Sequence, residues 1–410
     1  MATVAGDSVE RAVFVRKATG LVRGWSTRDA FIYATFSINL ITLGLYIFGY
    51  APFIPDGGLL WAVLLSGFYL VVQGITYASL IAAMPRAGGD YVWISRVLGG
   101  SVGFVLAITG WWFILWLWVP IYANILNVEV LGPMAAIIGW DSAVDFLGKS
   151  DGIFFASVVT ALLATSIAAV VLFLLFSKTF GWNFYNAANN AFWAGTIPTG
   201  VWPYPGLLAA SFLGSPVLQF LLIAVLSLWF FGWVGTVFLS STRVIFAAAF
   251  DRVLPESVAK VDRNGVPYVA LLLMLVPSLG IAALYAYSTD FATYTLDATL
   301  VIAVTFLGSA VAAAVLPWRK REIYNASPIA KYKVIGIPLI TFTSTLFIAF
   351  LVFCLVKWLF DDIYGVNDGG SLIFMGSLYL LAIVIFAGSR IYRRRQGMDL
   401  SMAYGEIPAE

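Results

Sequence analysis

The sequence predicts an all-α, polytopic helical membrane protein. Of its 410 residues, 61% are hydrophobic and only 11% are charged, and the mean hydropathy is +0.93. So few polar groups cannot cover a surface that faces water on all sides. The apolar residues also form continuous blocks of roughly 20, the length at which a helix crosses about 30 Å of hydrocarbon. These blocks do not alternate with polar residues, which excludes a membrane barrel.

Nine apolar segments are candidate membrane spans. They are residues 30–50, 59–83, 98–127, 153–176, 217–249, 267–287, 297–316, 335–359 and 370–389.

Lysine and arginine set the predicted orientation, because cytoplasmic loops carry an excess of both. They concentrate before the first span, in 84–97, after 217–249, in 317–334 and after the last span. We therefore expect a multi-pass protein of the cell membrane with cytoplasmic tails at 1–29 and 390–410 and a transmembrane domain at 30–389.

This orientation conflicts with the number of spans, because nine crossings cannot return the chain to the side where it began. The conflict lies between residues 131 and 216. Residues 179–216 are rich in Pro, Asn and aromatic side chains and form a poor spanning helix. Either a re-entrant or half-crossing segment lies here, or spanning helices are missing from the chain.

Three stretches resemble the transporters of the amino acid–polyamine–organocation (APC) superfamily. The most specific is the loop "MPRAGGDYVWISR" at 84–96. The other two are "SSTRVIFAAAFDRVLPESVAKVDRNGVPYVA" at 240–270 and "INLITLGLYIFGYAPF" at 38–53, where the family's run of small residues before Ile-Phe is only partly kept.

The resemblance implies an inverted-repeat transporter architecture. Family members usually have about twelve helices, of which 30–127 corresponds to one to three, 153–176 to the fourth or to a composite, and 217–389 to eight to twelve. Helices five to seven have no clear counterpart. We therefore expect about 9–10 spans and an incomplete fold, with an internal deletion near 165–180 that also explains the charge conflict.

The function implied by the resemblance is secondary active transport of amino acids or related amines by alternating access. It implies a small-molecule substrate, H⁺ or Na⁺ as the coupling ion, and no cofactor. The alternative is a transport-incompetent remnant or gene-model fragment, because the sixth helix forms half of the family's substrate site. An enzyme is disfavoured, since the chain has no His, one Cys and no nucleotide-binding loop. We expect no catalytic residues, no metal and no nucleic-acid partner.

The first expected substrate element is a break in the first span at Thr42–Leu43–Gly44. Transporters of this architecture unwind helices at mid-membrane, so that free amides bind an anionic group. Carbonyls near Ile38 and Asn39 would then face an amine. The alternative is a notch that lets helices pack closely.

Aromatic side chains form the second expected element. Trp112 and Trp116 share a face of the third helix, and Trp229 lies in "SLWFFGWVGT". They are candidates for an aromatic wall around an apolar or cationic group. The alternative is ordinary packing or contact with lipid.

The loop at 84–96 is the candidate inner gate, formed by Arg86, Asp90, Tyr91 and Arg96. Pro85 should end the preceding helix, and Gly88–Gly89 should form a tight turn. Asp90 is expected to pair with Arg86 or Arg96 or to cap the helical turn that follows, while Tyr91 is expected in the headgroup layer. The alternative is a charged anchor on the cytoplasmic surface.

Ionisable residues are expected only near span ends, at Asp29, Glu129, Asp297 and Lys357. A buried acid would indicate ion coupling. Glu129, at the outer end of the third helix, is the candidate, and the alternative is a solvated charge.

Overall fold

The structure is a computed structural model that describes residues 58–163, 213–262 and 266–405, together with scattered residues between 187 and 211. The first predicted span, the candidate break at 42–44 with Ile38 and Asn39, and the proposed deletion at 165–180 lie outside the described residues. The inverted repeat and the total number of spans therefore stay predictions.

Six helices in the described part of the chain are long and apolar enough to cross a membrane. They are α4 (Gly58–Ala83), the continuous helix Gly100–Ile137, α15 (Tyr268–Tyr287), α17 (Thr295–Arg319), α19 (Leu339–Phe360) and α20 (Gly369–Arg395). A further helix, α14 (Pro216–Phe250), has 35 residues. The all-α, multi-pass membrane fold is confirmed.

The helix Gly100–Ile137 has an irregular backbone. It comprises α6 (Gly100–Ile108), η2 (Thr109–Phe113), α7 (Leu115–Leu126), η3 (Asn127–Leu131) and α8 (Gly132–Ile137). The segments η2 and η3 are π-helical. Each holds one residue more per turn than an α-helix, a feature that often marks functional sites.

Shorter elements connect the long helices. They are α5 (Asp90–Val97), α9 (Asp141–Leu147), α10 (Ser150–Leu163), η4 (Glu256–Ala259), α16 (Thr289–Ala292), α18 (Arg321–Ala326), η5 (Pro328–Lys331), β1 (Lys333–Val334), β2 (Ile337–Pro338), η6 (Asp362–Tyr364) and η7 (Leu400–Tyr404). The two strands pair as an antiparallel hairpin, with Val334 opposite Ile337.

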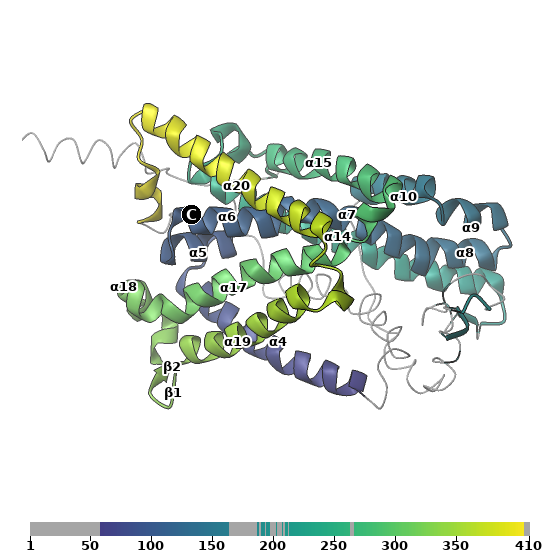
Figure 1. Cartoon of the computed structure of the whole chain (residues 1–410), viewed down its shortest axis with the longest axis horizontal. Helices are drawn as coiled ribbons and strands as arrows, with labels where there is room; N and C mark the ends of the chain where they lie inside the picture. The colour runs from purple at the N-terminus through teal and green to yellow at the C-terminus, as the bar shows by residue number, and fades with distance from the viewer. Residues whose placement is uncertain are drawn as a thin grey trace, which may run out of the picture.

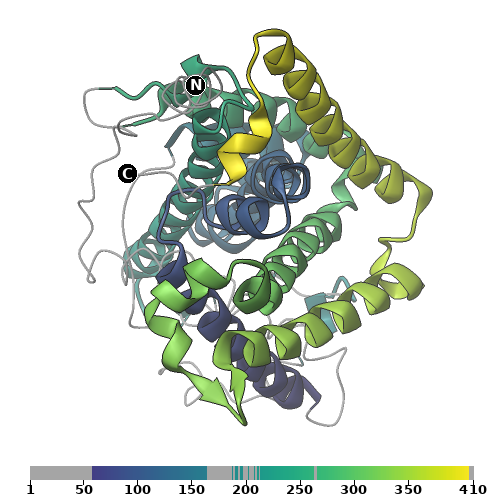
Figure 2. The same ribbon diagram turned by 90° about the vertical axis from the view of Figure 1, so that its left-hand side faces the viewer.

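The long helices run side by side, so the bundle has two ends (Figure 1). One end carries α5, α18, the hairpin and the end of α20, and we call it the basic end because Arg319, Lys320, Arg321 and Arg393–Arg395 lie there. The opposite end carries α8 and α9. Seen from the basic end, α6 lies near the centre, and α17, α19 and α4 follow outward in that order (Figure 2).

Close packing of α6 and η2 against α17 depends on glycine. A Cβ atom at Gly110 would lie 2.0 Å from the Oγ1 atom of Thr305. At this contact Thr305 donates a hydrogen bond of 2.7 Å to the carbonyl of Leu106. Small residues let membrane helices approach closely enough for such bonds.

Most helix bounds agree with the expected spans, and three differ by four residues or more. Helix α20 continues to Arg395, past the expected end at residue 389. The third helix continues past residue 127 to Ile137, because η3 and α8 extend it without a break. Helix α19 starts at Leu339 rather than 335, because the hairpin occupies residues 333–338.

Candidate functional site

The loop after α4 turns as predicted. Helix α4 ends at Ala83, two residues before Pro85, and Gly88 and Gly89 have φ angles of 105° and 45°. Gly88 is required for a second reason: a Cβ atom there would lie 2.5 Å from the Cβ of Ala247 in α14. The turn therefore brings α5 directly against the end of α14.

A buried ion pair joins these two helices. Nη1 and Nη2 of Arg96 lie 2.5 and 2.7 Å from the two carboxylate oxygens of Asp251, which follows α14. The hydroxyl of Tyr91 donates a further bond of 2.8 Å to Asp251. All three side chains are buried. Burial alone would lower the pKa of Arg96, but the charge and hydrogen bonds of Asp251 raise it, so Arg96 stays charged.

Asp90 has neutral donors around it. Its Oδ1 accepts hydrogen bonds from the hydroxyl of Tyr77 in α4, at 2.7 Å, and of Ser309 in α17, at 2.5 Å. The expected pairing of Asp90 with Arg96 is therefore wrong, because α5 packs against the end of α14 and Arg96 there binds Asp251. Burial raises the pKa of the Asp90 carboxyl, while the bonds from Ser309 and Tyr77 act in the opposite direction. Asp90 thus ties α5 to two spanning helices.

The structure also places Tyr91 and Arg86. Tyr91 is fully buried, which corrects its expected place in the headgroup layer, because its hydroxyl points inward to Asp251. Arg86 is half-buried, and its Nη1 donates a bond of 3.0 Å to the carbonyl of Pro85.

The C-terminal segment covers the ion pair. The guanidinium of Arg96 lies 5.4 Å from the ring centroid of Tyr404 in η7. The same ring lies over Gly100, where a Cβ atom would be 2.0 Å from a ring carbon. Leu400, in the same short helix, is also buried. The end of the described chain is thus packed on α5 and the start of α6.

Sequence reasoning missed Asp251, Tyr77 and Ser309 as members of this site. Asp251 had a usable signal: it is the acid directly after the apolar run "RVIFAAAF", inside one of the stretches that resemble the transporters. Tyr77 and Ser309 had none, because a single hydroxyl within an apolar span is common.

Trp112 and Trp116 lie together, and the polar atom of one of them is occupied. Their rings meet edge to face with centroids 6.1 Å apart. The indole nitrogen of Trp112 donates a bond of 3.1 Å to the carbonyl of Leu273 in α15. That carbonyl lacks its ordinary helical donor, because the residue four positions later is Pro277. Trp112 therefore supplies the hydrogen-bond donor that Pro277 removes from α15. Trp229 lies in α14, and its side chain is outside what the structure describes.

Glu129 and Asp297 are buried rather than solvated. Glu129 is 0% exposed within the spanning helix, since α8 extends that helix beyond it. This corrects the expectation of a charge at a wet helix end. Asp297, in the first turn of α17, accepts a bond of 2.8 Å from Ser371 in α20. An acid buried within a membrane span is costly, so it is a candidate for a functional role such as ion coupling.

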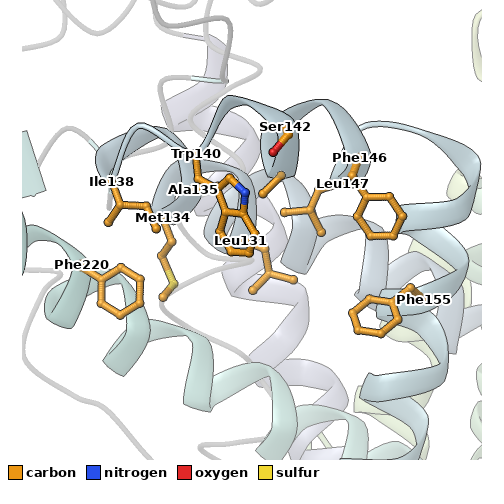
Figure 3. Close-up of a pocket in the computed structure, with 11 residues that line it drawn as sticks. Leu131, Met134, Ala135, Ile138, Trp140, Ser142, Phe146, Leu147, Phe155 and Phe220 are labelled. Atoms are coloured by element: carbon orange, nitrogen blue, oxygen red, sulfur yellow. The ribbon is translucent and has the colours of Figure 1, made fainter.

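An apolar hollow lies at the opposite end of the bundle, with a volume of about 590 Å³. Met134, Phe146, Phe155 and Phe220 line it from four different helices (Figure 3). Among its lining side chains only the hydroxyl of Ser142 and the indole of Trp140 are polar. The hollow therefore suits hydrocarbon and lacks partners for the charged ends of an amino acid.

Comparison with protein families identifies the chain's relatives. The family described as "Amino acid permease" matches residues 127–367, which is more than half of the chain. The chain belongs to the amino acid permease family. The permease is also 25% identical over 285 residues to "Uncharacterized protein 399" of Sulfolobus islandicus rod-shaped virus 1, covering 61% of the permease and 70% of that protein. Family membership makes a transporter the expected activity class and confirms the predicted resemblance.

Proposed function

We propose that the permease carries amino acids or related amines across the membrane by alternating access. The observation that carries this proposal is the family match over residues 127–367, which includes α14 and the helices up to α19. The clustering of Lys and Arg supports an orientation in the cell membrane in which the basic end and both tails lie on the cytoplasmic side.

The contacts of α5 support an inner-gate role for Asp90, Tyr91 and Arg96, and Arg86 is assigned to the same gate because it lies in the loop that leads into α5. Arg96 and Tyr91 hold α5 on Asp251, and Asp90 holds it on α4 and α17. A buried pair holds firmly, whereas a pair exposed to water contributes only about 0–1 kcal/mol. Water that enters from the basic end would therefore weaken the contact and favour opening.

Substrate binding is assigned to the predicted break at Thr42–Leu43–Gly44, with its carbonyls near Ile38 and Asn39. Trp116 and Trp229 would form the aromatic wall. Trp112 supports that wall, because its N–H group is already engaged with Leu273. Transport is coupled to H⁺ or Na⁺, and the buried Glu129 is the acid whose replacement tests this coupling.

The test is uptake into proteoliposomes that contain the purified permease. A panel of labelled amino acids and amines is offered under a proton gradient, under a sodium gradient and with neither. Saturable uptake of one member, reduced by Arg96→Ala, supports the proposal. Absence of uptake for every member, with the protein folded by circular dichroism and size exclusion, overturns it in favour of the transport-incompetent remnant that the charge conflict at 131–216 suggests.

A further inference from the structure

We propose that the hairpin β1–β2 anchors the permease in an anionic lipid surface, with Ile335 inserted between headgroups and Lys331 and Lys333 on lipid phosphates. This inference concerns a surface outside the transport pathway. It requires only the membrane location, so it stands or falls separately from the proposed function.

The tip of the hairpin holds an isoleucine, Ile335, at a turn position that disfavours β-branched residues. Ile335 and Gly336 form a two-residue connection, and both have positive φ, at 52° and 78°. This is the conformation in which Asn-Gly or Asp-Gly is preferred, and a β-branched residue is strained there. Turn formation therefore does not explain an isoleucine at this position.

Nothing within the described protein covers this isoleucine. Ile335 is 93% exposed, the largest value among the exposed large apolar residues of the described chain. Its neighbours Tyr332 and Ile337 are exposed as well. An apolar tip gains stability only from a partner outside the part of the chain that the structure describes.

The position of the hairpin matches the edge of a bilayer. It leads directly into the spanning helix α19, and it projects sideways from the bundle at the basic end (Figure 1). Viewed from that end, it lies at the outer rim of the bundle (Figure 2). A loop at the rim, level with helix ends, meets lipid headgroups rather than the transport path.

The charge around the tip selects the lipid. Lys331 and Lys333 lie on either side of the exposed Tyr332 and precede the tip, and the ammonium group of Lys331 lies 5.0 Å from the ring centroid of Tyr332. In residues 319–338 five basic residues face a single acid, Glu322. Each basic residue close to an anionic surface gives roughly a five-fold preference for it. An apolar tip that closely follows two lysines therefore fits an anionic bilayer surface.

The chain offers a direct test, because Cys354 is its only cysteine. In a Cys354→Ser background, Ile335→Cys is labelled with an environment-sensitive fluorophore. The permease is then reconstituted in phosphatidylcholine alone or mixed equally with phosphatidylglycerol. We expect emission at shorter wavelength and quenching by headgroup-proximal nitroxide lipids, both stronger in the anionic vesicles. Lys331→Gln with Lys333→Gln should abolish the difference between the two lipids.

Ile363 is the matched control site. It is an isoleucine, 83% exposed, in η6 at the opposite end, and it is preceded by Asp361 and Asp362. A probe at Ile363→Cys should show no gain in the anionic vesicles. If the probe at residue 335 emitted at the wavelength typical of water in both lipids, the proposed membrane anchor would be overturned. Equal quenching in both lipids would overturn the role of the lysines. A short-wavelength emission that disappears when the protein is diluted in lipid would indicate contact with a second copy of the chain instead.

Ile335→Asn provides a readout without a probe. It creates the Asn-Gly pair that the turn prefers, so the hairpin should fold at least as well while losing its apolar tip. We expect thermal stability in detergent to be unchanged or higher and the extra stability in phosphatidylglycerol vesicles to be lost. Retention of that lipid-dependent stability in Ile335→Asn would contradict the insertion.

Discussion

Arg96 and Asp251 lie 155 residues apart in the sequence and form a two-point ion pair inside the protein. The pair joins the short helix of the loop at 84–96 to the end of α14. A pair of this geometry fixes the relative position of two elements more tightly than a single contact.

Removal of one partner of this pair should be costly. Arg96→Ala or Asp251→Ala leaves an uncompensated buried charge, which typically costs about 3–5 kcal/mol. We expect a large fall in thermal unfolding temperature in detergent and a loss of uptake. Arg319→Ala, at an exposed position of the same end, is the control and should change little. If Arg96→Ala were no worse than Arg319→Ala, the pair would have no holding role.

Asp90 should make stability depend on pH. Burial raises its pKa above the ordinary value of 3.8, so the folded protein binds this proton at a higher pH than the unfolded chain does. The charged form is therefore penalised at neutral pH, and stability should rise as the pH falls through the raised pKa toward 3.8. Asp90→Asn should remove this part of the dependence. Unfolding temperatures across the acidic range measure it, and identical pH profiles for the two proteins would contradict it.

Trp112 and Pro277 should be energetically coupled. Trp112→Phe keeps the ring and leaves the Leu273 carbonyl without a donor, at a cost of about 1–3 kcal/mol. Pro277→Ala restores a backbone N–H group to α15. The double variant should therefore be more stable than Trp112→Phe alone, which a thermal-stability cycle would measure. Simple addition of the two single effects would show that the hydrogen bond does not matter.

Gly110 should not tolerate a methyl group. Alanine there would overlap the side chain of Thr305, so α17 would have to move away from the third helix. We expect Gly110→Ala to lower the unfolding temperature strongly. The same change at Gly67 in α4 has open space around it and should be neutral or slightly stabilising. Equal effects at both positions would argue against close packing at Gly110.

Hydropathy predicts where helices lie because the bilayer imposes a length on each span. Within the described chain, it predicted both ends of α4, α14 and α15 to within one residue. It failed at the end of the third helix, because Pro133 and a polar Glu129 resemble a stop, although a proline at the start of α8 is compatible with a continuing helix.

Partners within the site were harder to predict because they depend on how distant helices pack. The positive-φ turn at Gly88 and Gly89 follows from the local sequence. The choice of Asp251 rather than Asp90 for Arg96 does not, since it depends on the contact between α5 and α14. Local charge pairing therefore offered Asp90 as one partner of Arg96 and could not identify Asp251.

The two π-helical turns of the third helix have a consequence for every residue that follows them. In each, the N–H group bonds to the carbonyl five positions earlier, as Ile114 does to Thr109 and Gly132 to Asn127. Each extra residue rotates the rest of the helix by about 100° relative to a regular one. A single-residue deletion within Thr109–Phe113 would thus swing Glu129 around the helix axis without altering its neighbours in sequence. The register of the third helix, as much as its composition, decides which side chains meet lipid.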